Sequence, residues 1–372
     1  MNPFVYSVTA IDELKTGILE YIEKGNKPTL AFVFSSWAHA PAEIGKIFEK
    51  YDIDVFGATS FAEIDMGKIK EGSIVVMLLD ILRTSYRLDF FGGEKKSSFN
   101  IGQDTAAWSK TVFENPGLVV VTSLRDSNGD KVVNGIRSIS GSSATLLGGM
   151  AGNDINPEHY PVVYGSKISL INGIAALVID QDTIKLEGFT SSGWKGIGTS
   201  KTVTRSNENI VYSIDNQPAA EVYNKYLNIS RESELYDSGQ YGIQIEREDG
   251  SLVTRVAMSF NDDGSITFAG TIPQGTKIRF SSAPGIELVQ QTIDHLTEFH
   301  DKIPEADATV IFSCGARFFA LSPSIEKESI AVSNLWKVSC MGFFTFGEFG
   351  PDSKGLCDFH NFTLSLVLLK EI

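Results

Sequence analysis

The sequence has little of what secreted and metal-binding proteins use. Its 372 residues include three cysteines and five histidines, and the cysteines show no C-x-x-C spacing. Three cysteines cannot all pair within one chain, so we expect free thiols and a cytoplasmic location. The histidines lack the spacing of metal ligands, so we predict no metal site. The first residues also lack the basic and apolar segments of a signal peptide.

Basic residues are scarce relative to acidic ones. The net charge of −14 argues against a nucleic-acid partner and against an anionic membrane surface, because both are bound by basic faces. Apolar runs such as Ile74–Leu79 are far shorter than the ~20 residues that cross a bilayer. With 42% hydrophobic and 21% charged residues, the composition is that of a soluble globular protein. The length predicts two domains or one duplicated domain.

Standard catalytic and nucleotide-binding motifs are absent. There is no G-x-x-x-x-G-K-[ST], no G-x-G-x-x-G after a predicted strand, no H-E-x-x-H and no G-x-S-x-G. We therefore expect no bound cofactor and predict no catalytic residue from a motif.

What the sequence does contain is a pattern that occurs twice. A buried strand ends in two small polar residues, and a helical stretch follows, then a second strand that leads into G-x-x-[ST]-F-[AG]-E. The first copy spans 34–63, with another apolar strand at 73–79, and the second spans 312–348, with another at 363–369. Two copies predict a duplicated architecture with equivalent loops at the strand ends.

Strands and helices mix throughout the chain. Short strands between 162 and 188, with an Asn172-Gly173 turn, predict an antiparallel meander. A polar segment at 203–209 lacks periodicity, and we place a boundary there. We predict an α+β or α/β fold of two related halves, each a mixed β-sheet covered by helices, with domains at 1–205 and 206–372.

The second copy places Ser313, Cys314 and Arg317 where a strand ends and a helix begins. Backbone N–H groups and a guanidinium would bind a carboxylate there, although a purely structural role fits the pattern equally. Cys314 could act as a nucleophile with His360 as its base. A buried, inert thiol is the simpler interpretation, because the sequence places no base beside it.

Glu63 and Glu348 occupy equivalent places in the two copies, three residues after Ser60 and Thr345. Such a carboxylate could bind the ammonium group of a small ligand, or it could cap a helix or accept hydrogen bonds from loop N–H groups. Two of them could also form a general acid–base pair.

A glycine-rich stretch at 148–154 includes Gly149 and Asp154. Glycines allow a ligand to approach the backbone closely, but they are equally common in tight turns. Both interpretations stay open at this point.

These motifs, in this order, resemble the FIST family of sensory domains, which has an N-terminal and a C-terminal section. The residues that carry the resemblance are 57–63, 148–154 and 193–198, a linker over 203–219, and then 312–317, 342–348 and 360–364. The resemblance implies an intracellular sensory protein that binds a small ligand, with amino acids the suggested class. No residues are left for an output module, so we expect the signal to pass to a separate partner such as a kinase or a chemotaxis component.

Our first hypothesis is a sensor whose amino-acid ligand meets backbone N–H groups and Arg317 through its carboxylate, and Glu348 or Asp154 through its ammonium. The alternatives are an enzyme that uses Cys314 with His360 or Glu63 with Glu348, and an interaction scaffold without a ligand. The predicted ligand-binding residues are Ser60, Glu63, Gly149, Asp154, Ser313, Cys314, Arg317, Thr345, Glu348, His360 and Asn361.

Overall fold

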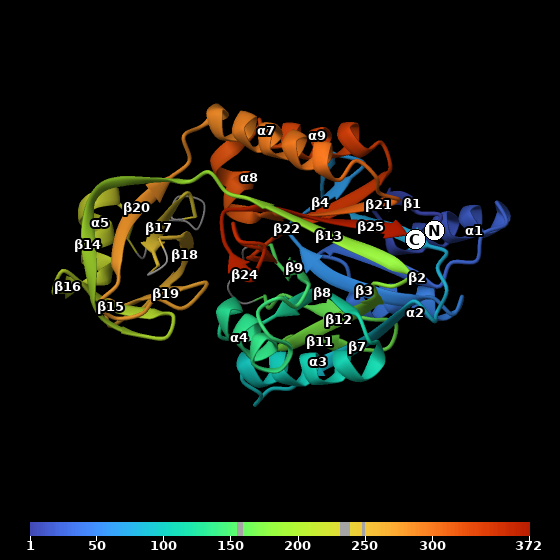
Figure 1. The fold of residues 1–372 in the computed structure, drawn as a ribbon, viewed down its shortest axis with the longest axis horizontal. Helices are drawn as coiled ribbons and strands as arrows, with labels where there is room; N and C mark the ends of the chain where they lie inside the picture. The colour runs from blue at the N-terminus through green and yellow to red at the C-terminus, as the bar shows by residue number, and fades with distance from the viewer. Residues whose placement is uncertain (155–158, 231–238, 248–249) are drawn as a thin grey trace.

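Three six-stranded β-sheets with one arrangement of strands form the body of the protein in a computed structural model (Figure 1). The structure describes residues 1–154, 159–230, 239–247 and 250–372. In each sheet, a central strand pairs with one parallel and one antiparallel neighbour. An edge strand lies beyond the antiparallel neighbour and a hairpin lies beyond the parallel one. The body therefore contains three copies of one structural unit.

Each unit has the same chain order: edge strand, helix, central strand, helix, parallel strand, hairpin, antiparallel strand. The first unit comprises β1 (Phe4–Val8), α1 (Leu14–Glu23), β2 (Leu30–Ser36), α2 (Pro41–Glu49), β3 (Asp54–Ser60), β4 (Ala62–Asp65) with β5 (Lys68–Glu71), and β6 (Ile74–Leu79). The second comprises β7 (Tyr86–Gly92), α3 (Ser98–Val112), β8 (Pro116–Ser123), α4 (Gly129–Ser140), β9 (Leu146–Met150), β10 (Val163–Tyr164) with β11 (Ser169–Leu170), and β12 (Gly173–Asp180). The third comprises β13 (Ile184–Ser191), α7 (Ile286–Lys302), β21 (Ala308–Cys314), α8 (Gly315–Leu321) with α9 (Glu326–Trp336), β22 (Ser339–Thr345), β23 (Glu348–Pro351) with β24 (Cys357–His360), and β25 (Leu364–Glu371).

Each hairpin belongs to one unit but extends the sheet of another. The β4–β5 hairpin pairs with β22 of the third unit, β10–β11 pairs with β3 of the first, and β23–β24 pairs with β9 of the second. The units are therefore interlocked and share one folded body.

The central strands are buried on both faces. In β2, Leu30, Phe32 and Phe34 face a core shared by all three sheets, whereas Ala31 and Val33 face the core beneath α1 and α2. This division follows from the two-residue period of a strand, and burial of both faces explains why these strands are continuous apolar runs. In the shared core, the ring of Phe34 lies 4.4 Å from that of Phe343, measured between centroids.

An insertion between β13 and α7 forms a separate β-barrel. Its elements are β14 (Lys195–Asn207), β15 (Ile210–Ile214), β16 (Gln217–Pro218), α5 (Ala219–Leu227), β17 (Tyr241–Glu246), β18 (Leu252–Phe260), β19 (Ile266–Phe268) and β20 (Lys277–Ser282). The strand order β14-β20-β17-β18-β19-β15 closes because β14 also pairs with β15. The barrel has its own core, which includes Tyr223 of α5, and it lies at one end of the molecule, beside α4, α8 and β24 (Figure 1).

The mixed α/β fold predicted from the sequence is confirmed. The repeated pattern is confirmed too, because β2, β3 and β6 match β21, β22 and β25 in order and direction. The second unit is a further copy that the sequence pattern did not reveal. Residues 205 and 206, between which we predict the domain boundary, both lie in β14, and the boundary stays a prediction.

The prediction of an antiparallel meander between residues 162 and 188 was wrong. Its strands are present, but β10 and β11, β12, and β13 lie in three different sheets. The Asn172-Gly173 pair leads from one sheet to the next, and the Asn172 amide donates to the carbonyl oxygens of Gly93 and Lys96. The spacing of turns identifies short strands but not the sheet that each one joins. Within the described ranges, no helix combines the length and apolar character needed to cross a bilayer.

Candidate functional site

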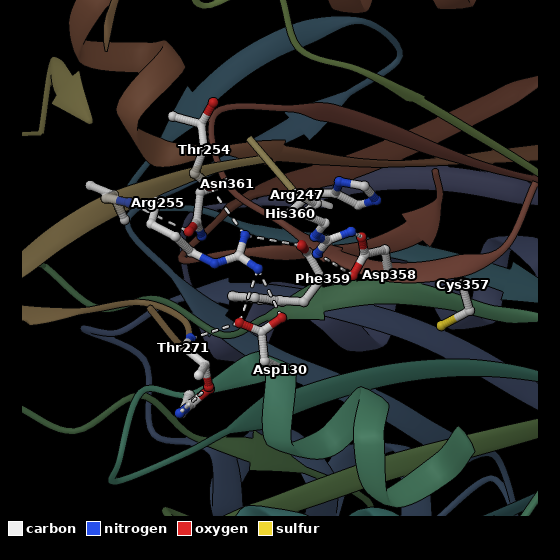
Figure 2. A network of polar contacts seen from close by, with 12 residues as sticks. Asp130, Arg247, Thr254, Arg255, Thr271, Cys357, Asp358, Phe359, His360 and Asn361 are labelled. Carbon is white, nitrogen blue, oxygen red and sulfur yellow. Dashed lines mark hydrogen bonds and ion pairs between the residues drawn. The ribbon is translucent and has the colours of Figure 1, made fainter. Parts of the chain in front are cut away.

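A buried ion pair fastens the barrel to the second unit. The Nη2 atom of Arg255, on β18, lies 2.8 and 2.9 Å from the two carboxylate oxygens of Asp130 (Figure 2). Asp130 lies in the first turn of α4, where the helix dipole favours a carboxylate, and it accepts a 2.7 Å hydrogen bond from the Thr271 backbone N–H. The Arg255 side chain is 1% exposed, so either charge without the other would be buried and uncompensated.

A second ion pair lies beside the first. Arg247, just after β17, contacts Asp358 of β24 with nitrogen–oxygen distances of 2.5 and 3.2 Å. Burial of Asp358 opposes its ionisation, but the hydrogen bond from Arg247 and nearby positive charge hold the Asp358 pKa below its usual range. Burial lowers the pKa of nearby His360, whose Nε2 donates to the Gly350 carbonyl oxygen at 3.2 Å.

An open cleft of about 980 Å³ lies between the barrel and the body at these ion pairs. The body contributes residues of α4 and Asp358 of β24, and the barrel contributes residues of β17, β18, β20 and the loop before β20. A cleft of this size is at the upper end of the range for small-molecule sites. Its charged residues are Arg137, Arg247, Arg255 and Lys277, with Asp130, Glu246 and Asp358.

Three of these charged groups have no ion pair with any residue that the structure describes. Arg137 donates through Nη2 to the Cys357 carbonyl oxygen, and its Nε is buried without a hydrogen-bond partner among the described residues. The Lys277 ammonium donates to the Thr202 hydroxyl at 2.7 Å. Glu246 is exposed at the end of β17. Arg137, Lys277 and Glu246 are therefore the charges with which a ligand could pair.

Arg317 lies elsewhere and is fully occupied. Its Nε and Nη2 donate to the Glu328 carboxylate, its Nη1 donates to the carbonyl oxygens of Ser192 and Phe362, and Nη2 also donates to the Thr292 hydroxyl. These bonds use all five guanidinium N–H groups of a side chain that is 0% exposed. In this arrangement Arg317 has no N–H group left for a ligand carboxylate, so its role in ligand binding stays a prediction without structural support.

Glu348 is also bonded within the protein. Its carboxyl group accepts hydrogen bonds from the Thr345 hydroxyl at 2.5 Å and the Thr363 hydroxyl at 2.6 Å. Burial raises the pKa of Glu348 to about 8, although these hydrogen bonds oppose the rise. The Thr345 hydroxyl also donates to the Ser313 carbonyl oxygen at 3.1 Å, so a protonated Glu348 can donate to Thr345 in turn.

Glu63 repeats this arrangement in the first unit. Its carboxyl group contacts the Ser60 hydroxyl at 2.5 Å and the Ser73 hydroxyl at 2.7 Å, and burial raises the pKa of Glu63 to about 7. Glu63 and Glu348 are both 0% exposed, and their hydrogen bonds link the ends of neighbouring strands. Their predicted role in binding the ammonium group of a ligand gains no support from this arrangement and stays a prediction.

Cys314 lacks the environment of a reactive thiol. Burial and the charge of Glu348 raise the Cys314 pKa well above its usual value, whereas catalytic cysteines need a lowered pKa. The cavity that Cys314 lines, with Met258 and Thr345, measures about 40 Å³. That is far below the roughly 300 Å³ of the smallest typical ligand sites. The hydroxyl of Ser313 is buried and has no hydrogen-bond partner in the part of the chain that the structure describes.

The glycine-rich stretch does not form part of the cleft. Gly149 is buried in β9, where an added Cβ would lie 2.6 Å from the Thr345 methyl carbon and 3.0 Å from the Phe312 ring. Its role is therefore close packing. Asp154 is half-exposed and lies 2.8 Å from Nδ1 of His159.

His360 and Asn361 are the predicted residues that lie beside the cleft network (Figure 2). The Asn361 side-chain oxygen accepts a 3.5 Å hydrogen bond from the Val256 backbone N–H, and its Nδ2 is buried with no partner within the described ranges. Neither residue lines the cleft itself.

The charged residues that do line the cleft were missed by the sequence analysis. One signal was present: Arg255 lies in the strand Leu252–Phe260, among residues that are mostly buried. A guanidinium in such a run requires a buried partner. The partner, Asp130, is 125 residues away in the sequence, so only the fold identifies it.

Two domain models of one protein family match most of the chain. Residues 29–217 match the FIST N domain and residues 219–351 match the FIST C domain. The chain belongs to the FIST family. FIST domains are sensory domains of signal-transduction proteins. No curated protein matches the chain.

The two FIST sections meet in the barrel. Strands β14 and β15 lie in the FIST N match, which ends within β16, whereas α5 and β17 to β20 lie in the FIST C match. Asp130 and Arg137 of the cleft belong to the FIST N section, and Glu246, Arg255 and Lys277 belong to the FIST C section. The cleft is therefore built jointly by the two sections that define the family.

Proposed function

We propose that this FIST protein is a sensor that binds a small zwitterionic ligand, an amino acid, in the cleft between the barrel and the second unit. The observation that carries this proposal is the size and charge of the cleft: about 980 Å³, with groups of both signs that form no ion pair with a described residue. An amino acid has a carboxylate and an ammonium group, so it needs partners of both signs in one place. Arg137 and Lys277 suit the carboxylate, and Glu246 suits the ammonium.

Ligand binding would act on the orientation of the barrel. Two short connections, residues 192–194 and 283–285, join the barrel to the body, and polar contacts that include the ion pairs described above hold the two together. A ligand in the cleft contacts both bodies and stabilises the arrangement that fits it best. A separate signalling protein, such as a kinase or a chemotaxis component, would read that arrangement.

The two alternative functions have less support. An enzyme that uses Cys314 would need a thiolate, and burial of this thiol disfavours one. A carboxylate pair of Glu63 and Glu348 would have to react at positions that are 0% exposed. A scaffold without a ligand would have no use for a charged cleft that both FIST sections build.

The binding proposal is tested with the purified full chain and each of the 20 amino acids. A ligand at 100 times its Kd adds about 2.7 kcal/mol to the free energy of unfolding, so the right amino acid raises the melting temperature measurably. Isothermal titration calorimetry then gives the Kd. If no amino acid changes the melting temperature and none gives a binding isotherm at millimolar concentration, the proposal is wrong.

The proposal that the ligand changes the orientation of the barrel is tested by the distance between two fluorescent labels. Glu221→Cys on α5 and Ala107→Cys on α3 place labels on the barrel and the body, and the native cysteines are buried. We expect energy transfer between these labels to change when the ligand binds. The matched control carries Lys15→Cys with Ala107→Cys, both on the body, and should not respond. A ligand that binds without changing the distance between the labels would disprove the proposed change in barrel orientation, but it would leave the binding proposal intact.

A further inference from the structure

The ion pairs of the cleft leave an unequal set of charges. Asp130 and Arg255 neutralise each other, as do Asp358 and Arg247. Among the charged lining residues that the structure describes, this leaves two cations, Arg137 and Lys277, and one anion, Glu246. The whole chain has a net charge of −14, so an excess of positive charge in the cleft is opposite in sign to the charge of the chain as a whole.

We infer that the ligand is a dicarboxylic amino acid, an inference that rests on the proposed function of the cleft. Such a ligand has two carboxylates and one ammonium group, which complement two cations and one anion. A neutral amino acid would leave one cation without a partner. A dicarboxylate without an ammonium group would leave Glu246 facing a negatively charged ligand, which is unfavourable.

The positions of the three groups require the ligand to bridge the two bodies. Arg137 extends from α4 of the second unit, whereas Lys277 and Glu246 lie on β20 and β17 of the barrel. The hydrogen bond from Arg137 to the Cys357 carbonyl oxygen orients its guanidinium, which then suits a carboxylate better than a freely moving side chain would. One carboxylate would bind the body, and the second carboxylate and the ammonium would bind the barrel.

The test compares four probes by titration calorimetry on the full chain: L-glutamate, L-aspartate, L-glutamine and glutarate. Loss of one charge-assisted interaction weakens binding by roughly 10- to 100-fold. We expect glutamate or aspartate to bind at least tenfold more tightly than glutamine, which lacks the second carboxylate. We expect the same margin over glutarate, which lacks the ammonium group.

Three variants assign the charges. Lys277→Gln and Arg137→Gln should each reduce the preference for glutamate over glutamine, and Glu246→Gln should reduce the preference for glutamate over glutarate. Lys277 and Glu246 are exposed, so their variants should fold even if Arg137→Gln does not. Lys15→Gln removes an exposed positive charge from α1, at the far end of the body from the barrel, and should change none of the affinities (Figure 1).

The outcomes separate this inference from the function on which it rests. Binding of a neutral amino acid with affinity equal to or above that of glutamate would overturn the inference and leave the proposed function intact. The same holds if glutamate binds but the three cleft variants behave like Lys15→Gln. If none of the 20 amino acids binds, both the inference and the proposed function are wrong.

Discussion

Arg255 and Asp130 join the two FIST sections through one ion pair, with the Arg255 Nη2 atom 2.8 and 2.9 Å from the Asp130 oxygens. The pair connects the barrel to the first turn of α4, and the Arg255 side chain is 1% exposed. A second contact reinforces it, because the Thr271 backbone N–H of the barrel donates to the same carboxylate. The ion pair therefore stabilises the arrangement of the barrel and the body, and both of its residues also line the cleft.

Asp130→Asn should destabilise the protein by about 3 to 5 kcal/mol, because it leaves the Arg255 guanidinium buried without a compensating charge. Urea unfolding followed by tryptophan fluorescence measures the change. The matched control is Asp104→Asn, which breaks an exposed pair with Lys96 and should cost less than about 1 kcal/mol. Equal effects of the two variants would show that the Asp130–Arg255 pair is not the structural connection described here.

Stability should fall as the pH rises from about 5 to about 8. Burial raises the pKa of Glu63 to about 7 and of Glu348 to about 8, above the 4.5 of an unperturbed glutamate. A raised folded-state pKa means that the folded protein binds more protons than the unfolded chain, so the contribution is complete below pH 4.5. It is lost as the pH passes the folded pKa, at up to about 1.4 kcal/mol per pH unit for each group.

Glu348→Gln isolates the contribution of one carboxyl group. The amide oxygen can accept from Thr363, and the amide nitrogen can donate to the Thr345 hydroxyl, as the protonated carboxyl does. Urea unfolding at pH 5.5, 6.5 and 7.5 should therefore show a weaker pH dependence for this variant. Glu20→Gln, at an exposed pair on α1, should keep the full dependence. Stability that rises with pH over this window in the unmodified protein would contradict the protonated state of both groups.

All three cysteines should be unreactive in the folded protein at neutral pH. Cys314, Cys340 and Cys357 are buried, and burial raises the pKa of Cys340 to about 11 and of Cys357 to about 12. Ellman's reagent should detect no thiol in the native state and three in 6 M guanidinium. Reaction of a single thiol under native conditions would revive the interpretation of Cys314 as a nucleophile, and Cys314→Ser would then identify it.

Two of the three units could be predicted from the sequence because only those two contain the motif G-x-x-[ST]-F-[AG]-E. Ser60 and Glu63 of the first unit correspond to Thr345 and Glu348 of the third, and each pair forms the hydrogen bond described above. At the equivalent positions, the second unit has Ala151 and Val163, as the strand registers show. The second unit therefore lacks both the hydroxyl and the carboxyl group of this hydrogen bond. A search for the motif therefore cannot find this unit.

The site was harder to predict than the fold. Strand and helix patterns are local, so the elements of the repeat could be read from short segments. Arg317 was assigned to a ligand because its local position, after a strand end, suits anion binding. Its actual partner, Glu328, lies on the next helix, and its carbonyl partners include Ser192, 125 residues away. Such contacts between distant parts of the sequence decide which buried charges have partners. They depend on how the elements pack together, which local sequence patterns do not show.

What the three units do share is a glycine at one register position, and this leads to a test of the repeat. Gly57, Gly148 and Gly342 each lie opposite an aliphatic residue of the central strand, namely Val33, Val120 and Ile311. A Cβ on Gly342 would lie 2.2 Å from the Ile311 carbonyl oxygen, and a Cβ on Gly148 would lie 1.9 Å from that of Val120.

Gly148→Ala and Gly342→Ala should therefore each destabilise the protein by about 3 kcal/mol or more. The added Cβ would clash with the backbone of the central strand, and one of the two paired strands would have to move. Gly148 also has a φ of +134°, which an alanine adopts only with strain. The matched control is Gly152→Ala, whose added Cβ would first meet the Phe346 ring at 3.3 Å and should cost about 1 kcal/mol or less. Thermal and urea unfolding of the three variants measure the difference. If Gly148→Ala is tolerated while Gly342→Ala is not, the second unit does not have the strand packing of the third, and the threefold repeat fails at this position.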